Sequence, residues 1–306
     1  MYLRVSITDR CNLRCTYCLP EDARFAPSRA TADELDRLMA AVVAAAGVTK
    51  IRLTGGEPTL APGLVQHLKT AAWLVPTVGL TTNGVLLEGM VAELVAAGLS
   101  RLNISLDAAD AEGFRRATRR DRFAQVVAGI RAAKRAGLTP LKVNAVATVD
   151  TDAPALVRFA IEEGVHLRFI ELMDIGEAHS TWAERHVASA VLQERLFAAG
   201  YSLIETPERD DPTSRVWTVA GVDPAVTSLG FITTVSDPFC ATCDRLRLSS
   251  QGRLHTCLFD EVGTDLLTPL RAGDLTGLDQ AIRHAVATKA PPAQFQRTAV
   301  MAAIGG

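Results

Sequence analysis

The sequence predicts an α/β protein built on a parallel sheet, and three observations support this. Strand-like and helix-like segments alternate six times over the first 174 residues, and glycines separate many of them. Polar residues recur on one face of four expected strands, although a parallel strand covered on both faces is nearly all apolar. After residue 174 the alternation stops, and irregular segments with short strands follow. The alternation alone fits either a partial barrel or an open doubly wound sheet.

The strand–helix units can be placed along the chain in order. Residues 3–7 alternate as a strand does, and a cysteine-rich loop follows them. Thr31 and Glu34 form a capping-box pattern, so a helix is expected to run to about residue 46 and to stop at Gly47. Further strands are expected over residues 50–54, 77–81, 101–106, 141–149 and 166–172. The helices between them are expected over residues 62–74, 86–97, 110–117, 122–136 and 153–163.

We expect the chain to divide into two parts, with the strand–helix units in residues 1–174 and a second subdomain in residues 175–306. The second part is expected to contain an antiparallel patch, with short strands around residues 215–219, 225–235, 244–249 and 253–258. Its helices are expected around residues 187–199, 264–272 and 276–288.

Composition excludes several functional classes. With 306 residues and 48% hydrophobic content, the chain can bury a large core, yet no apolar run reaches the roughly 18–20 residues of a membrane span. Residues 1–20 lack a signal-peptide pattern, so a cytoplasmic protein is expected. Six cysteines in that reducing compartment indicate metal binding rather than disulfides. The net charge of −2 argues against a general nucleic-acid binder.

Three cysteines lie close together near the start of the chain, at Cys11, Cys15 and Cys18. An iron–sulfur cluster of the 4Fe–4S type usually takes four thiolates, so three would leave one iron open to another ligand. By analogy with a catalytic zinc, such an open position indicates chemistry rather than scaffolding. The alternatives are a three-cysteine zinc site with a distant histidine, or plain buried thiols.

A second triplet, Cys240, Cys243 and Cys257, lies near the other end of the chain. His255 precedes the last of these cysteines by two residues, so a structural zinc site of Cys3His type is the alternative to a second open iron–sulfur cluster. A purely structural site is normally closed. Two incomplete triplets in one chain therefore favour the functional interpretation.

Cationic residues surround the second triplet. On a strand Arg245 and Arg247 point the same way, and two guanidiniums facing one site suit a phosphate or a carboxylate. A solvated strand face paired with acidic residues would look the same. Arg4, Arg52 and Lys142 on the expected parallel strands extend the group to five cations, which would suit a polyphosphate.

Alternate residues of a strand point to the same face of a sheet, so the polar residues within each expected strand lie on one face. A single polar residue in a strand is more often at the end of the strand or on an edge strand. Because such residues recur on four strands, they indicate an interior that holds a ligand. In parallel α/β folds, ligands bind at the carboxyl ends of the strands. The positions are Arg4, Ser6 and Thr8; Arg52 and Thr54; Asn103, Ser105 and Asp107; and Lys142 and Asn144.

Three further features are ambiguous from the residues alone. The Gly55–Pro58 stretch after a strand lets a ligand approach the backbone, but a tight turn would look identical, and Glu57 could bind an amino group or cap the next helix. Met173 fits core packing. The terminal Gly305-Gly306 fits a frayed end, although residues without side chains could also thread into a narrow site.

The motifs together resemble known families. The Cys11–Cys18 spacing with Tyr17 before the third cysteine, followed by Gly-Gly-Glu-Pro, resembles the radical S-adenosylmethionine superfamily. The second triplet, its embedded Arg-Leu-Arg and the final Gly-Gly resemble the GTP 3′,8-cyclases of molybdenum cofactor biosynthesis, the MoaA type. The resemblance spans Leu3 to Gly306. One departure is that the first cysteine comes only eleven residues in, which leaves an N-terminal contribution to barrel closure or dimerisation in doubt.

This resemblance implies a fold and a set of site residues. The fold would be a partial (β/α)6 TIM-like barrel closed by a C-terminal α+β subdomain that carries a second iron–sulfur cluster. The two cysteine triplets would each hold a 4Fe–4S cluster. Contacts to S-adenosylmethionine would come from Tyr17, Gly56, Ser105 and Met173. Contacts to GTP would come from Arg4, Arg52, Thr81, Lys142, Arg245 and Arg247, with Arg168 as a further candidate.

The reaction implied is the conversion of GTP to 3′,8-cyclo-7,8-dihydro-GTP, started when a 5′-deoxyadenosyl radical removes hydrogen from C3′ of the ribose. The cofactors carry this chemistry, so no side chain is assigned as a catalytic acid or base. The implied partners are an electron donor such as flavodoxin or ferredoxin and the downstream cyclic pyranopterin monophosphate synthase, and the chain would be a monomer or a homodimer. The alternatives are another radical enzyme with an auxiliary cluster, or a non-catalytic iron–sulfur or zinc sensor.

Overall fold

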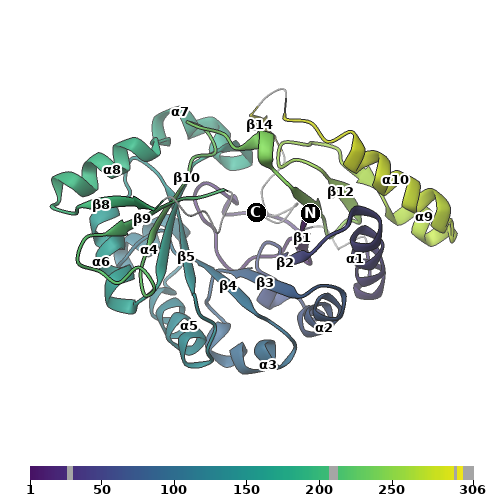
Figure 1. Ribbon diagram of the computed structural model, residues 1–306, viewed down its shortest axis with the longest axis horizontal. Coiled ribbons are helices and arrows are strands. Elements are labelled where there is room, and N and C mark those ends of the chain that lie inside the picture. The colour runs from purple at the N-terminus through teal and green to yellow at the C-terminus, as the bar shows by residue number, and fades with distance from the viewer. Residues whose placement is uncertain (26–29, 207–212, 293–294, 299–306) are drawn as a thin grey trace.

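A computed structural model of the chain describes residues 1–25, 30–206, 213–292 and 295–298. Its centre is a curved sheet whose six consecutive parallel strands lie in sequence order, each paired with the next. The helices cover the convex side of the sheet (Figure 1). The strands are β1 (Tyr2–Ser6), β2 (Lys50–Thr54), β3 (Thr77–Thr82), β4 (Arg101–Ser105), β5 (Lys142–Ala147) and β6 (His166–Glu171). The predicted α/β class and the order of its units are confirmed.

Helices follow these strands on the outside of the sheet. The capping box at Thr31 is present, and Gly47 ends the first helix in the left-handed conformation, as predicted. The helix expected over residues 86–97 is instead a 3-10 turn, Leu87–Gly89, followed by a short helix, because a glycine inside a helix lowers its stability. The helices are α1 (Ala32–Ala46), α2 (Leu64–Leu74), α3 (Val91–Ala96), α4 (Ala111–Thr118), α5 (Phe123–Arg135) and α6 (Ala153–Glu163).

The C-terminal part of the chain extends both edges of the sheet. Strand β11 (Arg245–Leu248) pairs in parallel with β1, and β10 (Leu229–Ile232) pairs in parallel with β6. The sequence did not predict these two parallel pairings. The expected antiparallel arrangement is confirmed on the other side of each strand, where β10 pairs with β9 (Arg215–Val219) and β11 pairs with β12 (Arg253–His255). Further out, β8 (Leu203–Thr206) is antiparallel to β9, and β13 (Thr264–Asp265) is antiparallel to β12. Strands β8 and β13 were not expected from the sequence.

The remaining elements close the outside of the fold. Helices α9 (Leu267–Ala272) and α10 (Leu275–Ala287) pack against α1, and the two-residue strands β7 (Asp174–Ile175) and β14 (Gln296–Arg297) pair with each other. Helices α7 (Trp182–Arg185) and α8 (Ser189–Ala198) follow β7. One sheet contains strands from both sides of residue 174, so the division there stays a prediction. No helix in the described ranges is long and apolar enough to cross a membrane.

Alternation along the parallel strands separates the core from the concave face. In β1 the fully buried Leu3 and Val5 alternate with the partly exposed Tyr2 and Arg4. The apolar side chains of the other strands form the same continuous core with the helices. The polar side chains on the opposite face are therefore held by a rigid sheet.

Candidate active site

A cavity of about 720 Å³ lies on the concave face of the sheet. Its volume falls in the range typical of ligand pockets. The structure brings all the sequence-predicted site residues to its wall. These are Cys11, Cys15, Cys18, Cys240, Cys243 and Cys257, then Tyr17, Gly56, Ser105 and Met173, and then Arg4, Arg52, Thr81, Lys142, Arg168, Arg245 and Arg247. The structure shows that these residues line one cavity, whereas the role of each residue stays a prediction.

The two cysteine triplets lie at opposite ends of the parallel strands. The Cys11–Cys18 loop follows the carboxyl end of β1. Cys243 comes two residues before β11, which runs parallel to β1, and therefore lies at the amino ends of the strands. Cys257 follows β12, which is antiparallel to β11, and returns to that same end. The cavity thus runs from one triplet to the other.

The first cysteine loop is packed against the two glycines that follow β2, Gly55 and Gly56. A Cβ atom on Gly56 would lie 2.4 Å from the carbonyl oxygen of Asp9, and one on Gly55 would lie 2.5 Å from that of Thr8. The Gly56 amide donates to the Thr8 carbonyl at 2.7 Å, and the Glu57 amide donates to the Arg10 carbonyl at 2.7 Å. The close approach that needs glycine is made by the loop's own backbone, so this stretch shapes the loop that carries the cysteines.

Glu57 acts as a cap in the structure, one of the two roles that the sequence left open. Its buried carboxylate accepts from the Thr59 amide at 3.0 Å, the Thr82 hydroxyl at 2.7 Å and the Asn83 amide at 2.7 Å. Burial raises the pKa of Glu57 against the effect of these bonds. Asn83 in turn lies with its side-chain nitrogen 3.9 Å from the Cys11 sulfur. The sequence places Asn83 at the carboxyl end of a strand but assigned it no contact; the structure shows that Asn83, directly after β3, gives the first loop a polar neighbour.

The chemistry of the first triplet fits a bound cationic cluster. Burial raises the pKa of Cys11, and it raises that of Cys15 well above the usual range with help from the nearby Asp107 and Cys18 charges. Thiols in such surroundings become thiolate ligands when a metal replaces their protons. Within the described ranges no three His, Cys, Asp or Glu side chains are spaced to hold a single metal ion. Thiolates of a four-iron cluster bind different irons and need not meet at one point.

The side chain of Tyr17 is held by the carboxylate of Asp107, which the sequence indicated only as one of the polar positions of the expected strands. Its hydroxyl donates to Asp107 Oδ2 at 2.9 Å, and the Val146 amide donates to Asp107 Oδ1 at 2.8 Å. Burial raises the pKa of Asp107 to about 6, although both hydrogen bonds favour its ionised form. This pair joins the first cysteine loop to the carboxyl ends of β4 and β5.

Cationic side chains form two rows across three neighbouring strands. The register aligns Arg4 with Arg247 on one side and with Arg52 on the other. The next row, two residues earlier on each strand, aligns Tyr2 with Arg245 and Lys50. We call these six residues the cation grid; Lys50 was not among the predicted contacts.

The cation grid and the strands beside it offer groups for an anionic ligand. Burial and the neighbouring guanidiniums lower the pKa of Arg4 to about 10, and burial lowers that of Arg247 well below its usual range. Like charges on adjacent strands destabilise a sheet unless an anion lies between them. Further along the sheet, the Thr81 hydroxyl and the Asn144 side-chain oxygen are buried without a hydrogen-bond partner among the described residues. A polar ligand in the cavity would satisfy such groups.

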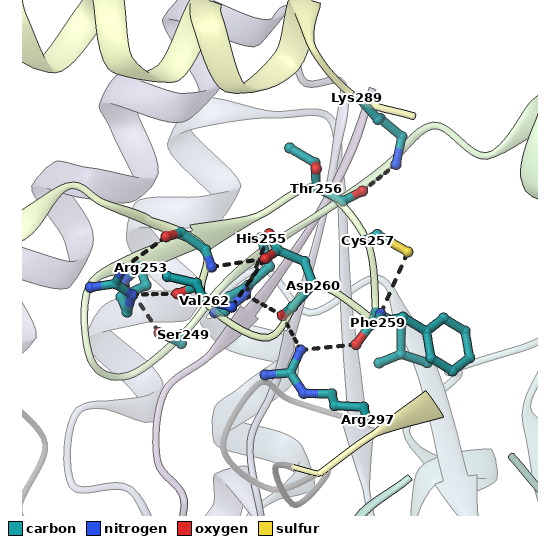
Figure 2. A network of polar contacts seen from close by, with 12 residues as sticks. Ser249, Arg253, His255, Thr256, Cys257, Phe259, Asp260, Val262, Lys289 and Arg297 are labelled. Carbon is teal, nitrogen blue, oxygen red and sulfur yellow. Dashed lines mark hydrogen bonds and ion pairs between the residues drawn. The ribbon is translucent and has the colours of Figure 1, made fainter. Parts of the chain in front are cut away.

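Cations from the C-terminal elements support the second triplet, and Figure 2 shows two of them, Lys289 and Arg297, in the polar network around Cys257. Lys289 lies with its nitrogen 4.0 Å from the Cys243 sulfur and donates to the carbonyls of Arg245 at 3.1 Å and of Thr256. The Phe259 amide donates to the Cys257 sulfur at 3.5 Å. Burial raises the pKa of Cys240, and the Lys289 charge opposes that rise. Bonds of this kind orient and tune the ligands of a metal cluster.

The loop after Cys257 is braced from β14 and from its own histidine. Buried Arg297 donates to the carbonyl of Leu258 at 2.9 Å and to that of Asp260 (Figure 2). The ring of His255 lies 3.0 Å from the Asp260 carbonyl and does not line the cavity. His255 thus supports the loop, whereas the three cysteines face the cavity. The terminal Gly305-Gly306 lies outside the described residues.

Comparison with known proteins defines the class first. Residues 5–152 match the model of the radical SAM superfamily, and residues 165–295 match the model described as Molybdenum Cofactor Synthesis C. The fold is similar to that of SuiB from Streptococcus suis, with a TM-score of 0.58 and 15% identity over 87% of this chain and 63% of that one. SuiB bound to S-adenosylmethionine gives the same TM-score, with 92% and 67% covered. The chain therefore has the α/β fold of radical SAM proteins.

Curated relatives narrow the class to one family. The chain is 42% identical to the GTP 3′,8-cyclase of Mycobacterium sp. strain KMS over 99% of its own length and 90% of the relative's. It is 43% identical to GTP 3′,8-cyclase 2 of Mycobacterium tuberculosis strain H37Rv and to the GTP 3′,8-cyclase of Rhodococcus opacus, again over 99% of this chain. The chain belongs to the GTP 3′,8-cyclase family.

Proposed function

We propose that this chain converts GTP to 3′,8-cyclo-7,8-dihydro-GTP in molybdenum cofactor biosynthesis. The observation that carries the proposal is the single cavity, which joins a cysteine triplet at each end to the cation grid between them. A cysteine triplet with an open iron suits S-adenosylmethionine, and a row of guanidiniums suits a triphosphate. Family membership supplies the particular reaction.

The proposed roles of the residues are those that the family resemblance implies, and their places on the cavity wall support them. Cys11, Cys15 and Cys18 would hold one 4Fe–4S cluster, and the second triplet would hold another near the guanine base. When bound, these clusters and S-adenosylmethionine supply the one-electron chemistry that removes hydrogen from C3′ of the ribose. Tyr17, Gly56, Ser105 and Met173 would contact S-adenosylmethionine. Arg4, Arg52, Thr81, Lys142, Arg245, Arg247 and Arg168 would contact GTP.

The sheet itself contributes positioning and shielding. A rigid concave face fixes the distance between the two ligands, so the reacting carbon is presented in one orientation. Reaction inside a cavity limits access of water and of other hydrogen donors to the reactive centre. The electron would come from a donor such as flavodoxin or ferredoxin, and cyclic pyranopterin monophosphate synthase would use the product.

The direct test is to incubate the reduced, anaerobically reconstituted protein with S-adenosylmethionine and GTP. Formation of 5′-deoxyadenosine together with the cyclised nucleotide is expected, and replacing GTP by ATP should suppress the second product. Absence of 5′-deoxyadenosine in protein loaded with iron would refute the reaction class. Stoichiometric zinc in place of iron would favour a zinc-binding sensor instead.

The substrate contacts make a separate prediction. Arg245→Ala and Arg247→Ala should each weaken GTP binding by roughly 10- to 100-fold, the value of one charge-assisted hydrogen bond, and leave S-adenosylmethionine binding unchanged. Isothermal calorimetry with each ligand measures both affinities. Arg271→Ala is the matched control, because Arg271 is exposed and pairs with Glu34 far from the cavity. Equal loss of both ligands in the Arg245 and Arg247 variants would contradict the assignment.

A further inference from the structure

Tyr2 occupies the centre of one row of the cation grid. In the sheet it lies between Arg245 on β11 and Lys50 on β2. Two residues further along β1, Arg4 lies on the same face as Tyr2, in the row that contains Arg247 and Arg52. The phenol is therefore surrounded by positive charge from its own strand and from both neighbouring strands.

The contacts of Tyr2 tie it to these cations. The Arg52 Nε atom donates to the Tyr2 hydroxyl at 2.5 Å, while Arg52 Nη1 donates to the Leu80 carbonyl at 3.0 Å. The Arg245 guanidinium lies 6.0 Å from the centre of the Tyr2 ring, and the Lys50 nitrogen lies 5.7 Å from it. Arg52 is thus held at both ends of its guanidinium, with Tyr2 on one side.

At this position a phenol can accept the Arg52 hydrogen bond while remaining uncharged, which neither a carboxylate nor a phenyl ring can do. A carboxylate would be ionised near neutral pH and would compete with an incoming phosphate for the guanidiniums. A phenyl ring would leave the Arg52 Nε atom without its acceptor. A neutral hydroxyl accepts the hydrogen bond and leaves the positive charge of the grid available.

The same surroundings make the hydroxyl unusually acidic. Burial by itself raises the pKa of Tyr2, but the charges of Arg52, Arg4 and Arg245 outweigh burial and lower that pKa to about 8. The titratable neighbours of Tyr2 on the cavity wall are Arg4 on its own strand, Lys50 and Arg52 on β2, and Arg245, Arg247 and the preceding Asp244 on the β11 side. The Met1 amine, which precedes β1, donates to the Gly47 carbonyl. Arg4, with its pKa near 10, keeps its charge over the range in which Tyr2 ionises.

We propose that Tyr2 is a positioning residue for the triphosphate of the substrate: its hydroxyl holds Arg52 in the cation grid, and its ionised form competes with phosphate for the same guanidiniums. This inference rests on the proposed function, because it takes the grid to be the triphosphate site. Binding and ionisation are then linked, so an anion bound in the grid disfavours the phenolate, and the phenolate disfavours the anion.

Calorimetry of the holoenzyme with inorganic triphosphate and with GTP tests the proposal at about pH 7 and about pH 9. Wild-type affinity should fall about tenfold between the two, because a group with a pKa near 8 is mostly ionised at the higher pH. Tyr2→Phe should bind more weakly at the lower pH and should change by less than about twofold between the two. Tyr201→Phe, whose hydroxyl contacts the Pro154 carbonyl, is the control and should behave as wild type.

A second measurement does not depend on any variant. Adding triphosphate to wild type at about pH 9 should lower the ultraviolet absorbance of tyrosinate, because the ligand returns a proton to Tyr2. Of the other two tyrosines, Tyr17 has a pKa raised well above its usual range by burial and stays protonated. Iron content and S-adenosylmethionine affinity of Tyr2→Phe should equal those of wild type, which shows that the variant is folded.

The outcomes separate this inference from the proposed function. A tenfold pH effect that persists in Tyr2→Phe, or an absorbance that triphosphate leaves unchanged, would overturn the role of Tyr2 while GTP binding stands. If wild type binds S-adenosylmethionine but neither GTP nor triphosphate at either pH, both the triphosphate site and the role of Tyr2 fail.

Discussion

At the scale of single residues, Asp107 illustrates how the cavity changes the chemistry of an ordinary carboxyl group. Its pKa is raised from 3.8 to about 6, and burial is the main cause. A carboxyl whose pKa is higher in the folded state contributes stability at pH values below its unfolded pKa. That contribution is lost as the pH rises through the folded value near 6. Near neutral pH, the ionised Asp107 carboxylate therefore lowers the free energy of unfolding.

Asp107→Asn should remove this pH dependence. The free energy of unfolding of the variant, relative to wild type, should rise by about 2 kcal/mol between about pH 4 and about pH 7, since one pKa unit corresponds to about 1.4 kcal/mol. Denaturant unfolding of cluster-free protein at both pH values measures the difference. Asp121→Asn is the control, because Asp121 is exposed. A difference that is the same at both pH values would contradict the prediction.

Single residues also mark the limit of what the sequence could predict. The alternation of β1 places Tyr2 and Arg4 on one face, so both could be expected to point inward. The sequence does not disclose that β11 lies beside β1, and that pairing adds Arg245 and Arg247 to the cation grid. For Glu57 the sequence left ligand and cap as equal choices, and only the placement of Asn83 and Thr82 around the carboxylate decides between them.

At the scale of elements, the local patterns were informative and the distant pairings were not. The periodicity and the glycine stops of the βα units act within about fifteen residues, so six strands and most of their helices were placed close to their observed bounds. The partners of β10 and β11 lie far away along the chain, and nothing in either segment specifies a parallel neighbour. Short strands gain their identity from the sheet that they join.

The brace between β14 and the Cys257 loop is an element-scale feature that makes a prediction. Arg297→Met should leave the Leu258 and Asp260 carbonyls without their donor, loosen the loop and reduce the iron bound at the second triplet, at a cost of about 1–3 kcal/mol in stability. Iron per chain after anaerobic reconstitution measures the effect. Arg271→Met makes the same change at an exposed ion pair and should keep the wild-type iron content.

The outcome that contradicts this role for Arg297 is specific. If Arg297→Met keeps full iron content while its unfolding midpoint falls, β14 stabilises the fold without positioning Cys257. If Arg297→Lys binds as much iron as wild type while Arg297→Met does not, a positive charge at this position is sufficient to hold the Cys257 loop. Both bonds come from the Nη1 atom of Arg297, so failure of rescue would indicate that the lysine nitrogen does not reach the position of Nη1 between the two carbonyls.

At the scale of the whole molecule, the parallel sheet keeps the two cysteine triplets apart and yet in one cavity. The first triplet depends on the carboxyl ends of β1, β2 and β3, through Gly56, Glu57 and Asn83. The second depends on β11, β12 and the C-terminal elements, through Lys289 and Arg297. The described contacts that support one triplet are thus separate from those that support the other, and the cation grid lies between them.

This separation predicts that each triplet can be removed without loss of the other. Wild type should bind about eight irons per chain, and replacing either Cys11, Cys15 and Cys18 or Cys240, Cys243 and Cys257 by Ala should leave about four. The variant without the first triplet should lose S-adenosylmethionine binding and keep most of its affinity for inorganic triphosphate, because the guanidiniums belong to the sheet. The variant without the second should keep S-adenosylmethionine binding. Iron analysis and calorimetry test this, and loss of all iron in either variant would show that the two ends are not independent.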